Sequence, residues 1–160
     1  DVGCGIGIVS LNVAKKLNKS SIIGIDIKKQ NILIAEQLLQ KTNLNNVNFI
    51  HGDINNQKNI EADYIILSNI LEHIENRTKF LKNIQKISNS KFFLIRVPNF
   101  ERDWQIAMRK ELGVYYFSDI DHKIEHTVDQ FKKELIKAGF TITELITVWG
   151  EIWAYCEYES

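Results

Sequence analysis

Asp1-Val2-Gly3-Cys4-Gly5-Ile6-Gly7 is the stretch that decides the fold. An acid and a valine lead into three glycines at alternate positions, and a helical pattern follows. Glycine lets the backbone turn tightly and lets a ligand approach without meeting a Cβ atom, although such turns also occur for packing alone. The N–H groups of the following helix favour a negative group such as a carboxylate or a phosphate. The stretch therefore predicts a strand end, a ligand-binding turn and a helix start.

Acids stand after the next two predicted strands. Asp26 ends the apolar run 21–26, where a carboxylate can accept both hydroxyls of a ribose. Asp53 follows the run 47–51, where it can accept a hydrogen bond from an exocyclic amine. A lone acid after a strand is most often a helix N-cap. Two acids at successive strand ends behind a glycine turn favour a nucleoside site.

Helical and strand patterns alternate along most of the chain. The helix after the glycine turn, residues 7–18, has Val9, Val13 and Leu17 at helical spacing. Alternation of this kind predicts an α/β fold, a Rossmann-like parallel sheet flanked by helices on both faces. The further expected elements are helices over 29–42 and around 80–87, and strands over 64–67 and 92–97, with a loop over 55–59.

The last part of the chain departs from this alternation. Thr127 and Gln130 have the spacing of a capping box, and Gly139 stands where a C-cap glycine belongs. The runs 141–149 and 152–157 are separated by two residues, so they form an antiparallel β-hairpin. Residues 99–126 are expected to be a long irregular insertion at the carboxyl edge of the sheet, where ligands of open α/β sheets bind.

Length and charge limit the choice of partners. The chain has 160 residues, with 20 basic and 20 acidic side chains, so no nucleic-acid partner is expected. No apolar stretch approaches the roughly 20 residues that span a bilayer, which predicts a cytoplasmic protein without a membrane span. Cys4 and Cys156 have no cysteine or histidine neighbours at zinc-site spacing. The chain is expected to be one domain, 1–160, a fragment that lacks most of its first strand and the helices before it.

The glycine turn fits one nucleotide better than two. A dinucleotide fingerprint needs a third glycine, and that position is Ile8 or Ser10, depending on the starting glycine. A pyrophosphate therefore fits poorly, while an amino-acid carboxylate with one ribose and one adenine fits well. An NAD-dependent oxidoreductase remains the alternative.

At this point the chain resembles class I S-adenosylmethionine-dependent methyltransferases over nearly its whole length. The first motif, Gly24-Ile25-Asp26-Ile27, Gly52-Asp53-Ile54 and the segment Ser68-Asn69-Ile70-Leu71-Glu72-His73-Ile74 carry the resemblance. The resemblance implies S-adenosylmethionine as cofactor and a class I methyltransferase fold. It also implies these cofactor contacts: Gly3, Gly5 and Gly7 along the methionine moiety, Asp1 at its ammonium group, Asp26 at the ribose, Ile27 and Ile54 around the adenine, Asp53 near its amine, and Ser68 and Asn69 in the pocket wall.

Methyl transfer from a sulfonium is an in-line displacement, so alignment in a dry pocket is the main task. A general base is needed only if the acceptor holds a proton. The candidate catalytic residues are His73, His122 and His126, each of which can also be a capping or solvated histidine.

Metal binding is left open. Some family members carry a Glu-x-x-Glu-His metal site here, and this chain resembles it in Glu72-His73 with Asn69 in place of the first Glu. With His122 or His126 the set can hold a divalent ion, but no metal is assigned.

The sequence thus predicts a methyltransferase acting on a small-molecule or lipid-like acceptor. A non-catalytic cofactor-binding subunit is a further alternative, and a homodimer stays open.

Overall fold

The structure, a computed structural model, describes residues 1–58 and 60–158. Asn59 of the predicted loop 55–59 lies outside the described residues. The chain divides into two compact units, Asp1–Ile60 and Glu61–Ser160, called here the N-terminal and C-terminal units.

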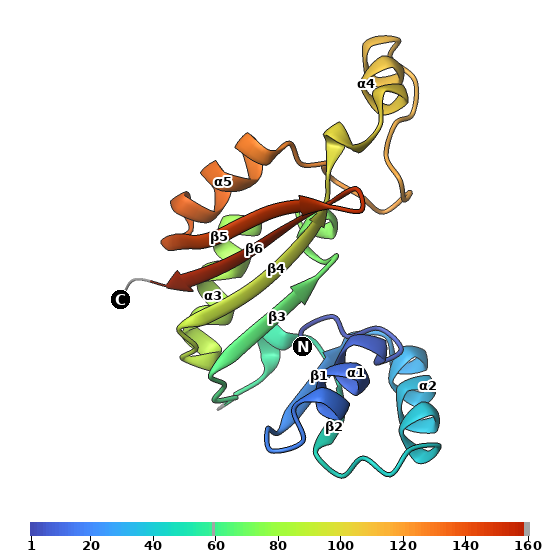
Figure 1. Cartoon of the computed structure of the whole chain (residues 1–160), viewed down its shortest axis with the longest axis vertical. Coiled ribbons are helices and arrows are strands. Elements are labelled where there is room, and N and C mark those ends of the chain that lie inside the picture. The colour runs from blue at the N-terminus through green and yellow to red at the C-terminus, as the bar shows by residue number, and fades with distance from the viewer. Residues whose placement is uncertain (59, 159–160) are drawn as a thin grey trace. The chain divides into compact units, whose positions relative to one another are not determined.

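The N-terminal unit alternates helices with a small parallel sheet (Figure 1). The strands β1 and β2 pair in parallel from Ile22↔Val47 to Asp26↔His51, and Val2 forms a further parallel bridge with Ile25. Both predicted strands are confirmed. The elements are α1 (Ile8–Lys16), β1 (Ile22–Asp26), α2 (Lys29–Gln40), β2 (Val47–His51) and the short 3-10 helix η1 (Ile54–Asn56).

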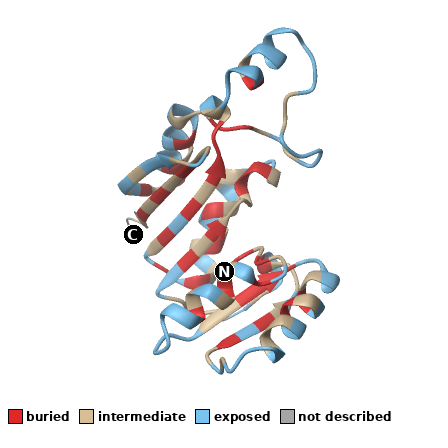
Figure 2. Cartoon of the chain, turned by 45° about the vertical axis from the view of Figure 1, so that its right-hand side comes forward, coloured by how far each residue is buried: buried red, intermediate tan, exposed pale blue. Residues whose placement is uncertain are grey.

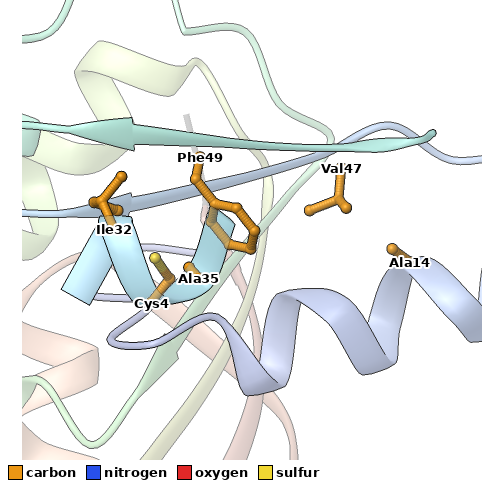
Figure 3. Packing of buried hydrophobic residues seen from close by; sticks show 6 residues of the cluster. All are labelled: Cys4, Ala14, Ile32, Ala35, Val47 and Phe49. Carbon is orange, nitrogen blue, oxygen red and sulfur yellow. The ribbon is translucent and has the colours of Figure 1, made fainter. Parts of the chain in front are cut away.

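The buried face of α1 differs from the predicted one. The helix buries Ser10 and Ala14, while Leu17 is 53% exposed at its end. A Cβ on Gly24 of β1 would lie 2.9 Å from Ser10 Oγ, so α1 approaches the strand too closely for large side chains. Figure 3 shows the core on which this packing rests, with members from both helices and β2: Cys4, Ala14, Ile32, Ala35, Val47 and Phe49.

The C-terminal unit is built on a four-stranded sheet in the order β3-β4-β6-β5. Strands β3 and β4 are parallel, whereas β6 pairs antiparallel with both β4 and β5, which confirms the predicted hairpin. The elements are β3 (Tyr64–Ser68), η2 (Leu71–His73), α3 (Arg77–Ser88), β4 (Phe92–Pro98), η3 (Phe100–Arg102), α4 (Trp104–Glu111), α5 (Val128–Lys137), β5 (Phe140–Val148) and β6 (Glu151–Tyr158).

Alternating burial orients this sheet. In β4, Phe93, Ile95 and Val97 are buried, whereas Leu94 and Arg96 are more exposed. Figure 2 shows this alternation of buried and more exposed residues along the strands. The hairpin turn places Trp149 and Gly150 at positive φ, which suits two-residue turns between twisted strands. Helix α5 begins with the predicted capping box of Thr127 and Gln130.

The insertion 99–126 is more regular than predicted. It contains η3 and the eight-residue helix α4, whose first turn is capped by the Asp103 side chain through the Gln105 N–H. The prediction of an irregular segment is therefore wrong for residues 104–111. Helix α4 escaped the sequence analysis because it buries only one of its residues, Ile106. A helix with so little apolar burial has no clear amphipathic pattern in its sequence. No helix among the described residues is long and apolar enough to cross a membrane.

Candidate functional site

The glycine turn of the N-terminal unit combines an open position with a tightly packed one. Gly3, Gly5 and Gly7 have φ of 69°, 55° and 81°, a region that favours glycine. A Cβ on Gly5 would meet nothing within 4 Å. A Cβ on Gly7 would lie 2.6 Å from Phe49 Cζ and 2.9 Å from Ala35 Cβ. Gly5 therefore leaves space for a ligand, whereas Gly7 is needed for the packing of α1 against α2 and β2.

Asp26 lies at this turn. Its Oδ2 accepts a hydrogen bond from the Gly5 N–H at 2.8 Å, and its Oδ1 accepts from the Lys28 N–H at 2.8 Å and from Asn31 Nδ2 at 3.1 Å. The residue is 7% exposed. Three donors thus hold a buried carboxylate beside the open space at Gly5.

The other acid of the turn, Asp1, also faces α1. Its Oδ2 accepts a hydrogen bond from Ser10 Oγ at 2.6 Å. The first turn of α1 has no side-chain cap and no acidic residue. Its backbone donors therefore remain suited to an anionic group.

Asp53 caps a short helix. Its Oδ1 accepts from the N–H and the side-chain amide of Asn55, both at 2.9 Å, at the start of η1. Ile54 is buried, and Ile27 is 64% exposed. Asp53 thus has the N-cap role considered at the outset, and its contact with an adenine stays a prediction.

Ser68 and Asn69 belong to the C-terminal unit, at the end of β3. Asn69 has φ of 57°, and its N–H donates to the Arg96 carbonyl at 2.9 Å. With its amide oriented to satisfy both neighbours, Asn69 donates to Glu151 Oε2 and accepts from Arg96 Nη2, each at 3.1 Å. The Asn69 side chain is therefore engaged by Arg96 and Glu151.

Three predicted residues of the C-terminal unit come together as the Glu72–His73–His122 group. Each offers one ligand atom, and these atoms lie within 4.8 Å of one another. The two imidazole rings meet edge-on, with centroids 4.7 Å apart. The Lys123 N–H donates to the Glu72 carbonyl at 2.7 Å and ties the insertion to η2. The pairing of Glu72 and His73 with His122 is the first of the two arrangements that the sequence left open.

The surroundings of Glu72 and His73 favour the neutral forms of these two side chains. Both carboxylate oxygens of Glu72 are buried and have no hydrogen-bond partner among the described residues. Burial raises the pKa of Glu72 to about 7, and Glu151 and Glu125 add to this. Burial and then His122 lower the pKa of His73. A carboxylate and two imidazoles so placed can hold a divalent cation, which would compensate the buried charge.

His126 lies in a different environment. Its side chain is fully buried, its Nε2 is 3.4 Å from Glu134 Oε1, and its ring contacts Phe131. Glu134 also accepts from Arg77 Nε at 2.6 Å, so this cluster joins α3 to α5. The geometry therefore separates His126 from the Glu72–His73–His122 group.

Sequence reasoning missed Glu125, which is also buried. Burial alone would raise its pKa, but hydrogen bonds from Ser118, Arg102 and His122 hold the pKa of Glu125 below its ordinary value. No local pattern distinguishes this glutamate from the other acids of the insertion.

The two cysteine thiols are buried and unreactive at neutral pH. Burial, followed by the Asp26 charge, raises the pKa of Cys4 to about 11, and burial raises the pKa of Cys156 to about 12. Neither thiol is a thiolate nucleophile at neutral pH.

Comparison with known proteins identifies the family. A family described as a methyltransferase domain matches residues 1–151. The chain belongs to this methyltransferase family. That membership confirms the resemblance drawn from the glycine turn and the strand-end acids.

The curated relatives of this chain carry names that point to different acceptors. The mitochondrial ubiquinone biosynthesis O-methyltransferase of Dictyostelium discoideum is 33% identical over 98 residues, which cover 54% of this chain and 30% of the relative. The ribosomal protein L11 methyltransferase of Thermotoga maritima is 30% identical over 111 residues, covering 69% of this chain and 40% of the relative. The matches thus span well under half of each relative's length.

A solved structure shares the fold. The magnesium protoporphyrin IX methyltransferase from Synechocystis PCC 6803, crystallised with SAH (S-adenosylhomocysteine), superposes with a TM-score of 0.77 at 18% identity, over 99% of this chain and 73% of that one. This likeness confirms the predicted Rossmann-like class I methyltransferase fold.

Proposed function

We propose that this protein transfers a methyl group from S-adenosylmethionine to a small-molecule or lipid-like acceptor. The observation that carries the proposal is the buried Asp26 carboxylate, held by the Gly5 N–H at 2.8 Å beside a turn with room for a ligand. An adenosine attached to an amino acid needs both features, a carboxylate for its ribose hydroxyls and a bare backbone for the methionine moiety.

The remaining cofactor contacts follow the same logic. The uncapped start of α1 receives the carboxylate of the methionine moiety, because free N–H groups and the helix dipole favour an anion there. Asp1 takes the ammonium group, and the exposed Ile27 covers one face of the adenine. These roles, with those of Asp53, Ile54, Ser68 and Asn69, remain predictions.

The Glu72–His73–His122 group receives the acceptor in this proposal. In the displacement, a lone pair of the acceptor attacks the methyl carbon, the carbon–sulfur bond breaks, and S-adenosylhomocysteine leaves. If the acceptor is a hydroxyl, its proton goes to an imidazole of this group, and His73 has the lowered pKa of a neutral base.

A divalent cation is the alternative occupant of the same group, because an imidazole nitrogen that binds a metal ion cannot also accept the proton. Glu72 offers two buried oxygens that have no partner in the described part of the chain, and two imidazoles lie within reach. Glu72, His73 and His122 would hold the ion, which would lower the pKa of an acceptor hydroxyl. Mixed carboxylate and imidazole ligands suit several transition metals.

The insertion supports an apolar acceptor. Six of its residues expose large apolar side chains after the carboxyl end of β4: Trp104, Met108, Leu112, Val114, Tyr115 and Ile120. Contiguous apolar patches mark contacts with apolar partners, and we propose that these side chains form such a patch. A lipid-like small molecule matches this chemistry better than a nucleic acid.

Binding and label transfer test the proposal. Calorimetry should detect binding of S-adenosylhomocysteine and none of NAD, and the reverse would favour the oxidoreductase. Methyl-labelled cofactor, supplied with cell extract and divalent metal, should label the solvent-extractable fraction. Label in RNA or protein would overturn the acceptor class, and binding without transfer would favour a non-catalytic subunit.

The organisation of the whole protein also stays a proposal. We expect residues 1–160 to act as one cofactor-binding domain in the cytoplasm. A homodimer is tested by light scattering of the protein at several concentrations.

A further inference from the structure

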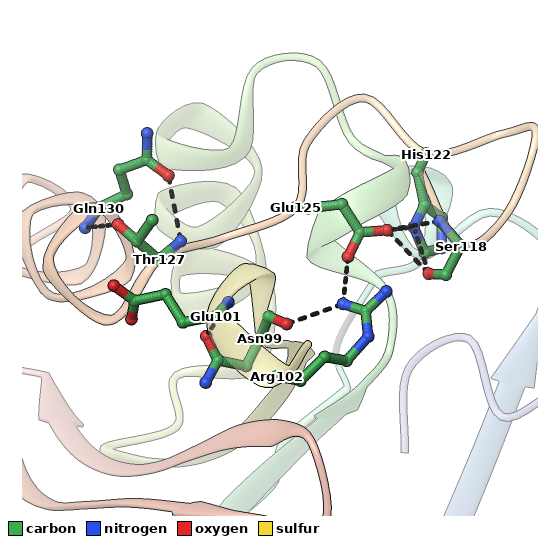
Figure 4. Close-up of polar contacts among 8 residues, drawn as sticks. All are labelled: Asn99, Glu101, Arg102, Ser118, His122, Glu125, Thr127 and Gln130. Carbon is green, nitrogen blue, oxygen red and sulfur yellow. Dashed lines mark hydrogen bonds and ion pairs between the residues drawn. The ribbon is translucent and has the colours of Figure 1, made fainter. Parts of the chain in front are cut away.

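Glu125 is a buried acceptor for an unusual number of donors. Its Oε2 accepts from Arg102 Nη1 at 2.6 Å (Figure 4). Its Oε1 accepts from the Ser118 N–H at 2.7 Å, from Ser118 Oγ at 2.8 Å and from His122 Nδ1 at 3.0 Å. The Glu125 side chain has no exposed surface. Four donors therefore fix both the position and the charge of this carboxylate.

This arrangement decides which nitrogen of His122 carries the proton. A charged carboxylate only accepts hydrogen bonds, so His122 Nδ1 must donate. In the neutral ring the lone pair then belongs to Nε2. The His122 side chain is 6% exposed, and its ring meets His73 edge-on.

We propose that Glu125 is a positioning residue that holds His122 in the Nδ1–H tautomer and keeps Nε2 available to the Glu72–His73–His122 group. Arg102 and Ser118 in turn hold Glu125. The inference rests on the proposed function of that group as the place where a metal ion or an acceptor binds. Carboxylates that fix the tautomer of a ligand histidine are common behind metal sites, and their loss costs roughly 10- to 100-fold in metal affinity or activity.

A second carboxylate–histidine pair provides the contrast. Glu134 lies 3.4 Å from His126 Nε2, and this ring is fully buried. The pair belongs to the Arg77 cluster between α3 and α5. It therefore resembles the first pair chemically but lacks a place in the ligand group.

Glu125→Gln tests the hydrogen bonds of Glu125 without a change in packing, because the two side chains have nearly the same size. One oxygen of Glu125 accepts from Arg102, and the other accepts from Ser118 and His122. An amide has a single oxygen, so one side must face an NH2 group. The variant loses either the Arg102 pair or the hydrogen bond from His122.

The experiment uses the full chain and two readouts. Nitrogen NMR of metal-free protein labelled in histidine should show wild-type His122 as the Nδ1–H tautomer and a mixture of tautomers in Glu125→Gln. Mn²⁺ affinity should fall roughly 10- to 100-fold in the variant while S-adenosylhomocysteine affinity is unchanged. Glu134→Gln is the matched control, with wild-type His122 signals and Mn²⁺ affinity.

The outcomes separate this inference from the proposed function. Wild-type His122 with its proton on Nε2 overturns the positioning role. So does an unchanged tautomer in Glu125→Leu, which leaves no acceptor on either side. If wild-type protein binds no Mn²⁺, the metal proposal fails and the tautomer alone decides the inference. Should the Glu125 variants not fold, the wild-type spectrum decides the inference, because a His122 proton on Nδ1 supports the positioning role and a proton on Nε2 overturns it.

Discussion

The Gly5 N–H donates to Oδ2 of Asp26 over 2.8 Å, between residues 21 positions apart. This bond fixes the end of β1 against the glycine turn. Because Oδ1 accepts from the Lys28 N–H and from Asn31 Nδ2, both oxygens of the Asp26 carboxylate accept hydrogen bonds. An amide cannot reproduce this pattern, since one of its two polar atoms is a donor.

Asp26→Asn should weaken S-adenosylhomocysteine binding by about 10- to 100-fold, the equivalent of one hydrogen bond to a charged group. The amide of Asn offers one acceptor oxygen fewer to the ribose, and its NH2 group can face the Gly5 N–H, which is also a donor. Calorimetry measures the affinity. Glu36→Gln, which changes an exposed acid on α2, is the control and should bind as the wild type does. Equal affinity of both variants would contradict the ribose role of Asp26.

Alanine at Gly7 should mainly reduce stability, whereas alanine at Gly5 should mainly reduce cofactor binding. Gly7→Ala places a Cβ 2.6 Å from Phe49 and should lower the free energy of unfolding by about 1–3 kcal/mol through overpacking, besides the cost of its positive φ. Gly5→Ala keeps only the φ cost, but its Cβ enters the ligand space and should weaken cofactor binding about tenfold or more. Urea unfolding and calorimetry on both variants check this. A larger stability loss in Gly5→Ala would contradict the assignment of open space.

The elements with local signals could be predicted from the sequence. Three local signals act within a few residues. They are the capping box of Thr127 and Gln130, the two-residue gap of the hairpin, and the apolar runs 21–26 and 47–51 beside Asp26 and Asp53. Hydrophobic periodicity and turn geometry therefore suffice for them.

Features that depend on distant partners could not be predicted. Helix α1 ends at Lys16, so Leu17 stands at its C-cap and is exposed, while the small Ser10 is the residue that packs against Gly24 on the neighbouring strand. Glu125 meets Arg102 across 23 residues of an insertion without periodicity. The sequence named His122 and His126 alike, and only the fold separates the ring beside His73 from the ring beside Glu134.

Glu72→Gln should stabilise the metal-free protein at about pH 8. The pKa of Glu72 is raised from 4.5 to about 7 by burial, so its contribution to stability is present below pH 4.5 and is lost as pH rises through about 7. Removing the charge should raise the free energy of unfolding by about 1–3 kcal/mol in the presence of EDTA. The variant should also lose any stabilisation by Mn²⁺. Urea unfolding with EDTA and with Mn²⁺ measures both, and a less stable variant in EDTA would contradict the buried, unpaired charge.

Glu134→Gln should destabilise the protein at neutral pH and have little effect in acid. Burial opposes the charge of Glu134, but hydrogen bonds from His126 and Arg77 hold its pKa below the ordinary 4.5. The stabilisation is therefore present above about pH 4.5 and is lost as pH falls through the lower folded-state pKa. We expect a loss of about 1–3 kcal/mol at pH 7, because Arg77 then faces a neutral amide in place of its carboxylate partner.

The matched control for this prediction is the exposed pair of Lys91 and Glu157, whose side chains are 62% and 35% exposed. Glu157→Gln should cost less than about 1 kcal/mol at either pH, since water screens such pairs. Urea unfolding of both variants at about pH 7 and pH 3 provides the comparison. An equal loss for Glu134→Gln at the two pH values would mean that the packing of its side chain, and not its charge, joins α3 to α5.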